Sequence, residues 1–313
     1  KEGAGQVVIL GLTNVGRSSL LASLTNAKVR ISSYPYTTQH PTPGMLQFED
    51  IQLQIVEAPA VMEGASAGGG WGLQTLTLAR NADALILMVD LAEDPCRQLS
   101  ILLKELEGAR ILVHRPKGRV EIERAPMGTG LRILLLGRLV DCQLNDVKEL
   151  LRSYRILNAT VRIYGEASLD DVEDAIFEST VYRPAVIVAN KLDLPGAKEN
   201  LQRLMEFVGG RMRVIPTSCV DGTGLKELGT ALFEALEIIR VYTKQPGERS
   251  PSPTPFVLKR GATVEDLAKR IHSDFHKRFL YARVWSKRFT FNPRRVGLSF
   301  RLDDGDVVEL HAR

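Results

Sequence analysis

The sequence predicts an α/β protein with a doubly wound parallel sheet, an inserted α/β subdomain and a small C-terminal α+β domain. Short apolar runs typical of buried strands alternate with amphipathic, helix-like segments along most of the chain. A glycine-framed turn joins the first such run, Val7–Leu10, to a helical segment at Leu20–Leu24. From Ile239 to Arg313 the composition changes, and short strand-like runs surround one strong helix at Val264–His272. These observations predict more than one domain.

The composition is that of a globular protein with a sizeable core. Of 313 residues, 44% are hydrophobic and 25% are charged. No apolar run approaches the roughly 18 residues that a membrane-spanning helix needs. The three cysteines, Cys96, Cys142 and Cys219, are scattered along the chain. Their spacing argues against a disulfide framework or a zinc site and favours a reducing, cytoplasmic setting.

Charge is distributed unevenly along the chain. Residues 240–313 hold 16 Lys and Arg against 8 Asp and Glu, a net charge of +8. The remainder holds 25 basic and 29 acidic residues, a net charge of −4. An acidic body with a basic tail indicates a polyanionic partner for the tail.

The turn after the first strand, Gly11–Ser19, has the spacing of a phosphate-binding loop. Two glycines separated by four residues precede a helix, so backbone N–H groups and the helix N-terminus would face an anion. Ser18 stands where a Mg²⁺-ligating hydroxyl belongs, but Arg17 stands where the pattern has lysine. The alternative interpretation is a tight strand-to-helix connection without a ligand.

The elements that follow alternate as a doubly wound sheet requires. Residues 34–44 contain three prolines and a glycine, which predicts a loop. Strands are predicted at 45–48, 51–56, 84–89, 185–189 and 214–216, and helices at 74–80, 99–106 and 225–236. Periodicity is lost over 115–132, after which helices at 144–151 and 169–176 flank a strand at 159–164. The predicted domains are therefore 1–117 with 183–238, an insertion at 118–182, and a C-terminal domain at 239–313.

A second motif, Asn190-Lys191-x-Asp193, directly follows the strand at 185–189. At this edge of an α/β sheet it is suited to reading a nucleotide base. The Asp193 carboxylate matches the two adjacent donors of guanine, N1–H and the exocyclic amine, which adenine lacks. The stem of Lys191 can cover the base, while Asn190 can tie this loop to the phosphate loop. Thr217-Ser218-Cys219, after the next strand, suits a backbone contact to the guanine carbonyl.

Together these motifs resemble the five successive motifs of a translation-factor-class GTPase. Tyr34-Pro35-Tyr36-Thr37-Thr38 and the glycine-rich segment Gly64–Gly72 are similar to the Obg superfamily. Within it, the insertion (Tyr154–Ala159, Val181–Pro184) and the tail (Ile239–Lys244, Thr263–Asp266, Tyr281–Trp285) resemble the developmentally regulated GTP-binding (DRG) proteins. The tail is similar to a TGS domain, a β-grasp module. The resemblance implies a P-loop GTPase fold that binds GTP, GDP and Mg²⁺.

The resemblance also implies roles for individual residues. Ser18, Thr38 (or Thr37) and Glu57 would complete the metal shell, and Thr38, Glu57 and Ala60 would be switch positions. The implied nucleotide-binding residues are Thr13, Asn14, Val15, Gly16, Arg17, Ser18, Ser19, Asn190, Lys191, Asp193, Ser218 and Cys219.

Departures from the family pattern gather at the γ-phosphate end of this site. Arg17 replaces lysine, and its planar fork is not equivalent to an ammonium group. Glu57-Ala58-Pro59-Ala60 replaces Asp-x-Pro-Gly. Val61 is not a departure: it resembles the family's hydrophobic substitution of the catalytic glutamine, so no side chain there could orient an attacking water. Asn14 could help to position K⁺, or it could only hold the shape of the loop.

The basic residues of the tail are interleaved with aromatic residues, as in Tyr281, Arg283 and Trp285. Stacking combined with phosphate attraction is typical of RNA binding. Alternatively, the aromatic residues form the small core of the domain and the charges are a solvated surface. We therefore expect one of two functions. The first is a slow, Mg²⁺-dependent GTPase switch acting on the ribosome or RNA. The second is a degenerate GTPase-fold scaffold that binds RNA or a protein partner without hydrolysis.

Overall fold

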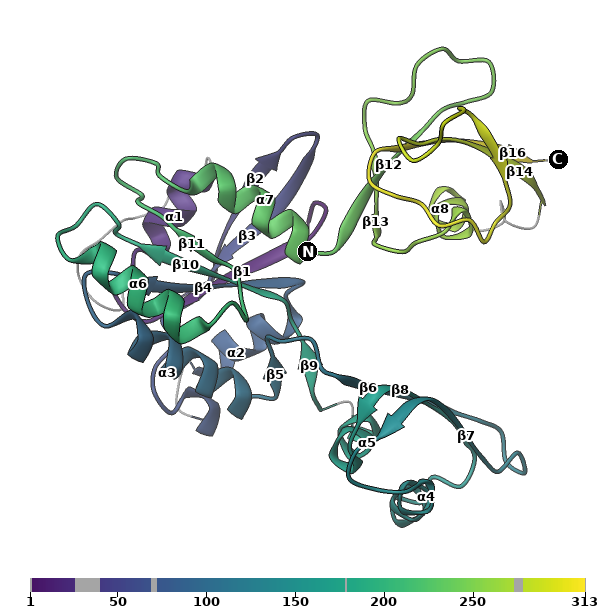
Figure 1. Cartoon of the computed structure of the whole chain (residues 1–313), viewed down its shortest axis with the longest axis horizontal. Coiled ribbons are helices and arrows are strands. Elements are labelled where there is room, and N and C mark those ends of the chain that lie inside the picture. Colours follow the sequence, from purple (N-terminus) through teal and green to yellow (C-terminus); the bar gives the residue numbers. More distant parts are fainter. Residues whose placement is uncertain (1, 26–39, 69–71, 178, 273–277, 313) are drawn as a thin grey trace.

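The computed structural model describes residues 2–25, 40–68, 72–177, 179–272 and 278–312. Three sheets of three or more strands, each with its own helices, make up the fold (Figure 1). Within the described residues, no helix is both long and apolar enough to cross a lipid bilayer.

The largest sheet contains six strands in the order β11-β10-β4-β1-β3-β2. Neighbouring strands are parallel except for the β2–β3 hairpin, which is antiparallel. The strands are β1 (Gln6–Gly11), β2 (Thr42–Phe48), β3 (Ile51–Glu57), β4 (Ala84–Asp90), β10 (Ala185–Asn190) and β11 (Val214–Pro216). The carboxyl ends of the parallel strands meet at one edge, which is where ligands bind in open α/β sheets.

Helices cover both faces of this sheet because alternate strand residues point to opposite sides. One face packs against α2 (Gly72–Asn81), α3 (Pro95–Gly108) and α6 (Ala197–Val208), and the other against α1 (Arg17–Leu24) and α7 (Leu225–Ala235). In β1, for example, Val8 and Leu10 belong to the first core, and Val7 and Ile9 to the second. The predicted doubly wound sheet is confirmed.

The inserted subdomain has a three-stranded sheet in the order β6-β8-β7 with two helices. Its elements are β6 (Gly118–Arg124), β7 (Leu131–Leu139), α4 (Leu144–Ser153), β8 (Ala159–Ala167) and α5 (Leu169–Phe177). Two short parallel strands, β5 (Ile111–Leu112) and β9 (Val181–Tyr182), connect it to the large domain (Figure 1).

The C-terminal domain has a five-stranded sheet in the order β13-β12-β16-β14-β15 with one helix. The elements are β12 (Ile238–Thr243), β13 (Phe256–Lys259), α8 (Val264–Ile271), β14 (Phe279–Trp285), β15 (Arg294–Val296) and β16 (Asp306–Ala312). Thr263 and Asp266 form a capping box at the start of α8, and Leu267 of this helix packs against Ala282 and Val284 in the core.

Two local predictions were wrong, and one helix was not predicted. Residues 118–124 form a strand because Val120 and Ile122 alternate with charged residues and pack against the subdomain core. Of the loop predicted at 34–44, residues 42–44 belong instead to β2, which begins at Thr42, and residues 34–39 lie outside the described residues. Helix α6, at Ala197–Val208, was not predicted. The boundaries 1–117 with 183–238, 118–182 and 239–313 stay a prediction.

Candidate functional site

The phosphate loop connects β1 to α1 at the carboxyl edge of the large sheet. Two of its residues adopt left-handed backbone conformations, Asn14 with φ 63° and Gly16 with φ 97°. Asparagine and glycine are the residues that tolerate this conformation. A Cβ atom on Gly16 would lie 2.5 Å from Nδ2 of Asn190, so glycine is required for close approach as well.

Asn190 joins the loops that sequence analysis assigned to the phosphate and to the base. Its side-chain amide donates a hydrogen bond to the carbonyl of Val15 at 3.0 Å, and the residue is 3% exposed. Its Oδ1 accepts hydrogen bonds from the Thr217 hydroxyl at 3.3 Å and the Cys219 thiol at 3.4 Å. The tie predicted between residues 190 and 11–19 is therefore present, and it extends to the loop after β11.

Asp193 and Lys191 are each held by a second residue. The Ser218 hydroxyl donates to Oδ1 of Asp193 at 2.7 Å, which orients the carboxylate. Nζ of Lys191 lies 2.5 Å from Oδ2 of Asp90, a buried carboxylate at the end of β4. Sequence analysis missed Asp90. The register of the sheet pairs it with Asn190, and its position as the last residue of a buried apolar strand was the available signal.

Burial also sets the state of Cys219, the last residue of the 217–219 motif. Desolvation raises the pKa of its thiol to about 11. The thiol is therefore protonated at neutral pH and can donate to Asn190.

At the opposite end of the phosphate loop, Ser18 contacts the last residue of β3, and Arg17 contacts the residue that follows it. The Ser18 hydroxyl donates to Oε1 of Glu57 at 2.6 Å, and Glu57 is 1% exposed. Nη1 of Arg17 donates to the carbonyl of Ala58. Burial lowers the pKa of Arg17, and the charge of Glu57 opposes this shift. The Arg17 guanidinium thus lies within the protein, beside the first switch residues.

The donor set at this end fits a magnesium ion. Mg²⁺ prefers hard oxygen ligands such as hydroxyl and carboxylate groups, and Ser18 and Glu57 bring one of each within hydrogen-bond distance. The remaining predicted ligand, Thr38 or Thr37, lies outside the described residues, as does the whole Tyr34–Thr38 motif.

The segment after Glu57 is fixed to the rest of the domain by backbone hydrogen bonds. Ala58 N–H donates to the carbonyl of Ile9 at 3.2 Å, and Val61 N–H donates to that of Gly11 at 3.0 Å. The Val61 side chain packs in the core and is 3% exposed. An apolar side chain buried in this way does not orient an attacking water. The predicted switch residue Ala60 lies between these two anchored positions.

A second residue missed by sequence analysis, Glu105 of α3, holds the next part of this segment. Its carboxylate accepts backbone N–H bonds from Gly64 and Ser66, each at 2.7 Å, and the residue is 2% exposed. Burial opposes its ionisation, but the hydrogen bonds from Ser66 and Gly64 prevail and hold the pKa of Glu105 below its ordinary value. Because its neighbours in the sequence of α3 include other charged residues, the sequence did not indicate that the Glu105 carboxylate points inward.

This arrangement defines a P-loop nucleotide-binding domain. A strand leads through a loop with a left-handed glycine into a helix, and the loop suited to reading a base lies at the same edge of the sheet. Comparisons with known proteins agree. Residues 6–116 match the 50S ribosome-binding GTPase family, residues 129–238 match the C-terminal region of the MMR_HSR1 domain, and residues 239–312 match the TGS domain.

Relatives extend the match to nearly the whole chain. An uncharacterized GTP-binding protein, MJ1326 of Methanocaldococcus jannaschii, is 33% identical, with 99% of this chain and 78% of the relative covered. Developmentally-regulated GTP-binding protein 2 of Homo sapiens is 31% identical, with 99% and 83% covered. Among solved structures, the FeoB G-domain of Methanococcus jannaschii is 14% identical with a TM-score of 0.41, covering 74% of this chain and 97% of that chain.

The chain belongs to the family of developmentally regulated GTP-binding proteins, and it is a guanine-nucleotide-binding protein with a C-terminal TGS domain.

Proposed function

We propose that this protein is a guanine-nucleotide switch that binds GTP with Mg²⁺, hydrolyses it slowly and acts on RNA or the ribosome. The observation that carries the proposal is the Asn190–Val15 hydrogen bond, which joins a base-reading loop to a phosphate-binding loop. Asp193, oriented by Ser218, would accept from guanine N1–H and the exocyclic amine. The Lys191 stem would cover the base, and the backbone at Ser218 and Cys219 would meet the guanine carbonyl.

Residues 13–19 would hold the phosphates through backbone N–H groups and the N-terminus of α1. Ser18, Glu57 and Thr38 would hold Mg²⁺, which when bound neutralises developing charge on the phosphate oxygens. In place of a catalytic glutamine the chain has Val61, whose side chain is buried. Hydrolysis would therefore be slow unless a further cation, such as K⁺ held near Asn14, or a partner supplied charge.

The first prediction concerns Arg17. We expect Arg17→Lys to bind GTP about tenfold more tightly, because a lysine ammonium is compact and freely rotating whereas the guanidinium is committed to the Ala58 carbonyl. GDP affinity should change less, and single-turnover hydrolysis should accelerate. Titration with fluorescent GDP and a non-hydrolysable GTP analogue measures the affinities.

The matched control is Arg80→Lys, since Arg80 also donates to backbone carbonyls, those of Ala109 and Ser179, but does so away from the loop. Failure of both the native chain and Arg17→Lys to bind any guanine nucleotide saturably would refute the switch. The alternative, a scaffold without nucleotide chemistry, would then be the better account.

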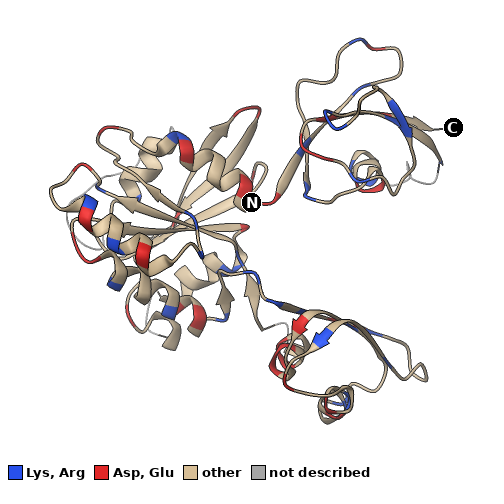
Figure 2. Cartoon of the chain, viewed as in Figure 1, with Lys and Arg blue, Asp and Glu red and all other residues tan. Residues whose placement is uncertain are grey.

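We propose that the partner surface is one face of the TGS sheet, which we call the basic–aromatic face. On β14, Tyr281, Arg283 and Trp285 alternate with Ala282 and Val284, which are buried in the core. The face contains Lys244, Tyr281, Arg283, Trp285, Arg295 and His311, together with one acidic residue, Glu309, which pairs with Arg283 and His311. In Figure 2, several stretches of this domain's ribbon carry the colour of lysine and arginine.

The groups of this face are ordered by contacts with one another. The Arg295 guanidinium lies 4.0 Å from the centre of the Tyr281 ring, and Tyr281 stacks on His311 at 4.3 Å. Nζ of Lys244 lies 4.6 Å from the centre of the Trp285 ring. On such a surface the cationic groups can attract phosphates, and the aromatic and guanidinium planes can contact unstacked bases. This combination favours single-stranded RNA as the partner. Phe279, Phe289 and Phe300 instead pack against the core, as the alternative interpretation of the tail expected.

The second prediction tests this face. We expect Tyr281→Ala combined with Arg295→Ala to weaken binding of a labelled single-stranded RNA by about 10- to 100-fold. Native binding should weaken steeply between low and moderate salt, because counterions are released from the RNA. Lys269→Ala is the control, since Lys269 pairs with Glu265 on α8. A salt-independent affinity, or equal loss in both variants, would contradict RNA binding by this face.

A further inference from the structure

The β2–β3 hairpin runs from the nucleotide site to the TGS domain. Its register pairs Thr42 with Glu57 at one end and Phe48 with Ile51 at the other. Seven paired residues span roughly 20 Å at about 3.3 Å per residue. Glu57, at the first end, is hydrogen-bonded to Ser18 of the phosphate loop. The opposite end is the turn at Glu49 and Asp50.

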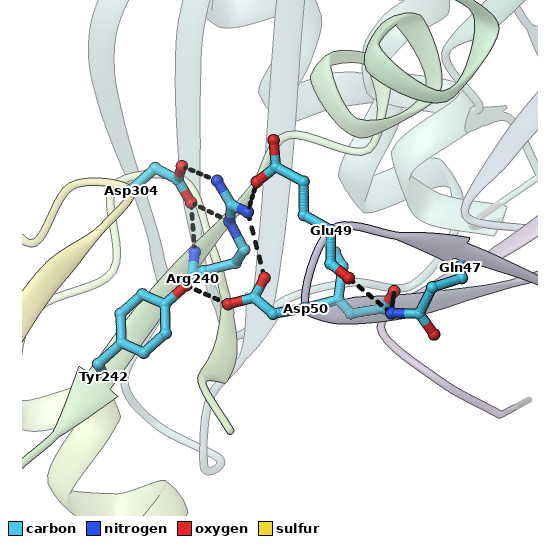
Figure 3. A network of polar contacts seen from close by, with 7 residues as sticks. Gln47, Glu49, Asp50, Arg240, Tyr242 and Asp304 are labelled. Atoms are coloured by element: carbon cyan, nitrogen blue, oxygen red, sulfur yellow. Dashed lines mark hydrogen bonds and ion pairs between the residues drawn. The ribbon is translucent and has the colours of Figure 1, made fainter. Parts of the chain in front are cut away.

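This turn is attached to the TGS domain by a partly buried arginine, Arg240 of β12 (Figure 3). Its Nη1 pairs with Asp50 at 3.1 Å and with Glu49. On the TGS side, the Nε and Nη2 atoms of Arg240 bond Asp304 at 3.1 and 2.8 Å, and its backbone N–H does so at 2.7 Å. The Arg240 side chain is 14% exposed, whereas the side chains of Glu49, Asp50 and Asp304 are 60%, 28% and 34% exposed, so solvent screens the pair with Glu49 more than the pairs with Asp50 and Asp304. We call this group of residues the Arg240 node.

Further contacts make the node rigid. The Tyr242 hydroxyl donates to Asp50, and burial together with this hydrogen bond raises the pKa of Tyr242 to about 12, so it stays a donor at neutral pH. The amide of Gln47 donates to the carbonyls of Glu49 at 2.7 Å and Ile51 at 3.2 Å, which fixes the turn.

Aromatic packing adds a third point of attachment, on α7. Phe48 stacks on Phe233 with ring centres 5.3 Å apart, and the guanidinium of Arg240 lies 5.1 Å from the centre of the same ring. The hairpin tip, α7 and the first TGS strand are therefore packed against one another.

We propose that the hairpin and the Arg240 node mechanically couple the nucleotide site to the TGS domain. The proposal rests on the proposed function, because it requires that the site binds guanine nucleotide. Glu57, at the first end of the hairpin, accepts a hydrogen bond from the Ser18 hydroxyl. A nucleotide-bound metal would engage this same hydroxyl. A change at Glu57 would be passed to β2, which among the described strands pairs with β3 alone, and then to the turn that holds Arg240.

Linkage makes this coupling reciprocal. If exchanging GDP for GTP changes the affinity of the TGS domain for a ligand by some factor, that ligand changes the ratio of GTP affinity to GDP affinity by the same factor. The basic–aromatic face and the nucleotide site then act as one regulated unit.

The test measures the distance between fluorophores encoded at Lys104 on α3 and Arg270 on α8, in full-length protein saturated with GDP or a GTP analogue. For the native chain we expect one narrow distance distribution whose mean differs between the two nucleotides. For Arg240→Ala we expect a broad distance distribution that is the same with GDP and with the GTP analogue. Without the arginine, the carboxylates of Glu49, Asp50 and Asp304 face and repel one another, so the two domains are no longer held together at this point. The ratio of GTP to GDP affinity should also change about fivefold or more.

Asp50→Asn is the second variant, and it should show a weaker effect in the same direction while keeping the shape of the side chain. Arg138→Ala is the control, because its ion pair with Glu166 lies within the inserted subdomain and takes part in neither the nucleotide site nor the basic–aromatic face. Nucleotide binding with distances and affinity ratios identical in the native chain and Arg240→Ala would overturn the coupling but leave the proposed function standing. Absence of saturable guanine-nucleotide binding in the native chain would overturn both.

Discussion

Asp193→Asn is expected to lower the affinity for GTP and GDP by about 100- to 1,000-fold, or roughly 3–4 kcal/mol. The carboxylate is an acceptor at both oxygens, whereas an asparagine amide puts a donor against one of the two guanine donors. Xanthine carries a carbonyl in place of the guanine amine. The variant should therefore bind xanthosine nucleotides better than guanosine nucleotides, a reversal that a simple loss of folding would not produce.

Competition titrations with GDP, xanthosine diphosphate and ADP against one fluorescent nucleotide measure this change in specificity. Asp170→Asn, at an exposed carboxylate in the first turn of α5, should leave all three affinities unchanged. The reversal also depends on Ser218, whose hydroxyl holds Asp193 in place. If Asp193→Asn kept the native preference for guanine, Asp193 would not be the base-reading residue.

The meeting of the two principal loops was predictable from sequence because it follows from topology. Gly11–Ser19 and Asn190–Asp193 each follow a buried parallel strand, and such strands end at the same edge of a sheet. The residue types then allowed Asn190 to be assigned as the tie between them. The structure contains this contact as a 3.0 Å hydrogen bond from Asn190 to the carbonyl of Val15.

Residues that support the site were not predictable in the same way. Asp90 and Glu105 act through partners that the sheet register and helix packing bring close, Lys191 in one case and the backbone of Gly64 and Ser66 in the other. A single carboxylate in a strand end or a charged helix has many possible surroundings. The position of Asp90 at the end of a buried apolar strand marks it as a candidate site residue, but the partner of each carboxylate depends on tertiary contacts that no local pattern records.

The Arg240 node shows the same limit over a longer separation. Sequence analysis placed Arg240 in the TGS-like segment, but Glu49 and Asp50 lie about 190 residues earlier in a hairpin turn. In the insertion, the strand at 118–124 was missed because charged residues on its open face hide the two apolar ones. Both cases concern side chains whose partners come from distant strands.

Gly16→Ala is expected to have the second large effect, because two independent requirements meet at this glycine. Its φ of 97° is strained for a residue with a side chain, at a cost of roughly 1–2 kcal/mol. A Cβ atom would also lie 2.5 Å from Nδ2 of the buried Asn190. Asn190 must then move and release Val15, leaving a buried amide unsatisfied at a further cost of about 1–3 kcal/mol. We expect stability to fall by about 3 kcal/mol and guanine-nucleotide affinity by more than 100-fold.

Gly210→Ala separates strain from collision. Gly210 also has a positive φ, 74°, but a Cβ atom there meets nothing within 4 Å, so this variant carries only the strain. Urea unfolding and nucleotide titration should show a small loss of stability and unchanged binding for Gly210→Ala. The double variant Gly16→Ala/Asn190→Ala should lose less stability than the two single variants combined, because removing the amide removes the collision. It should still bind nucleotide poorly, since the loops are no longer tied. Additive losses of stability would show instead that backbone strain alone explains why glycine stands at position 16.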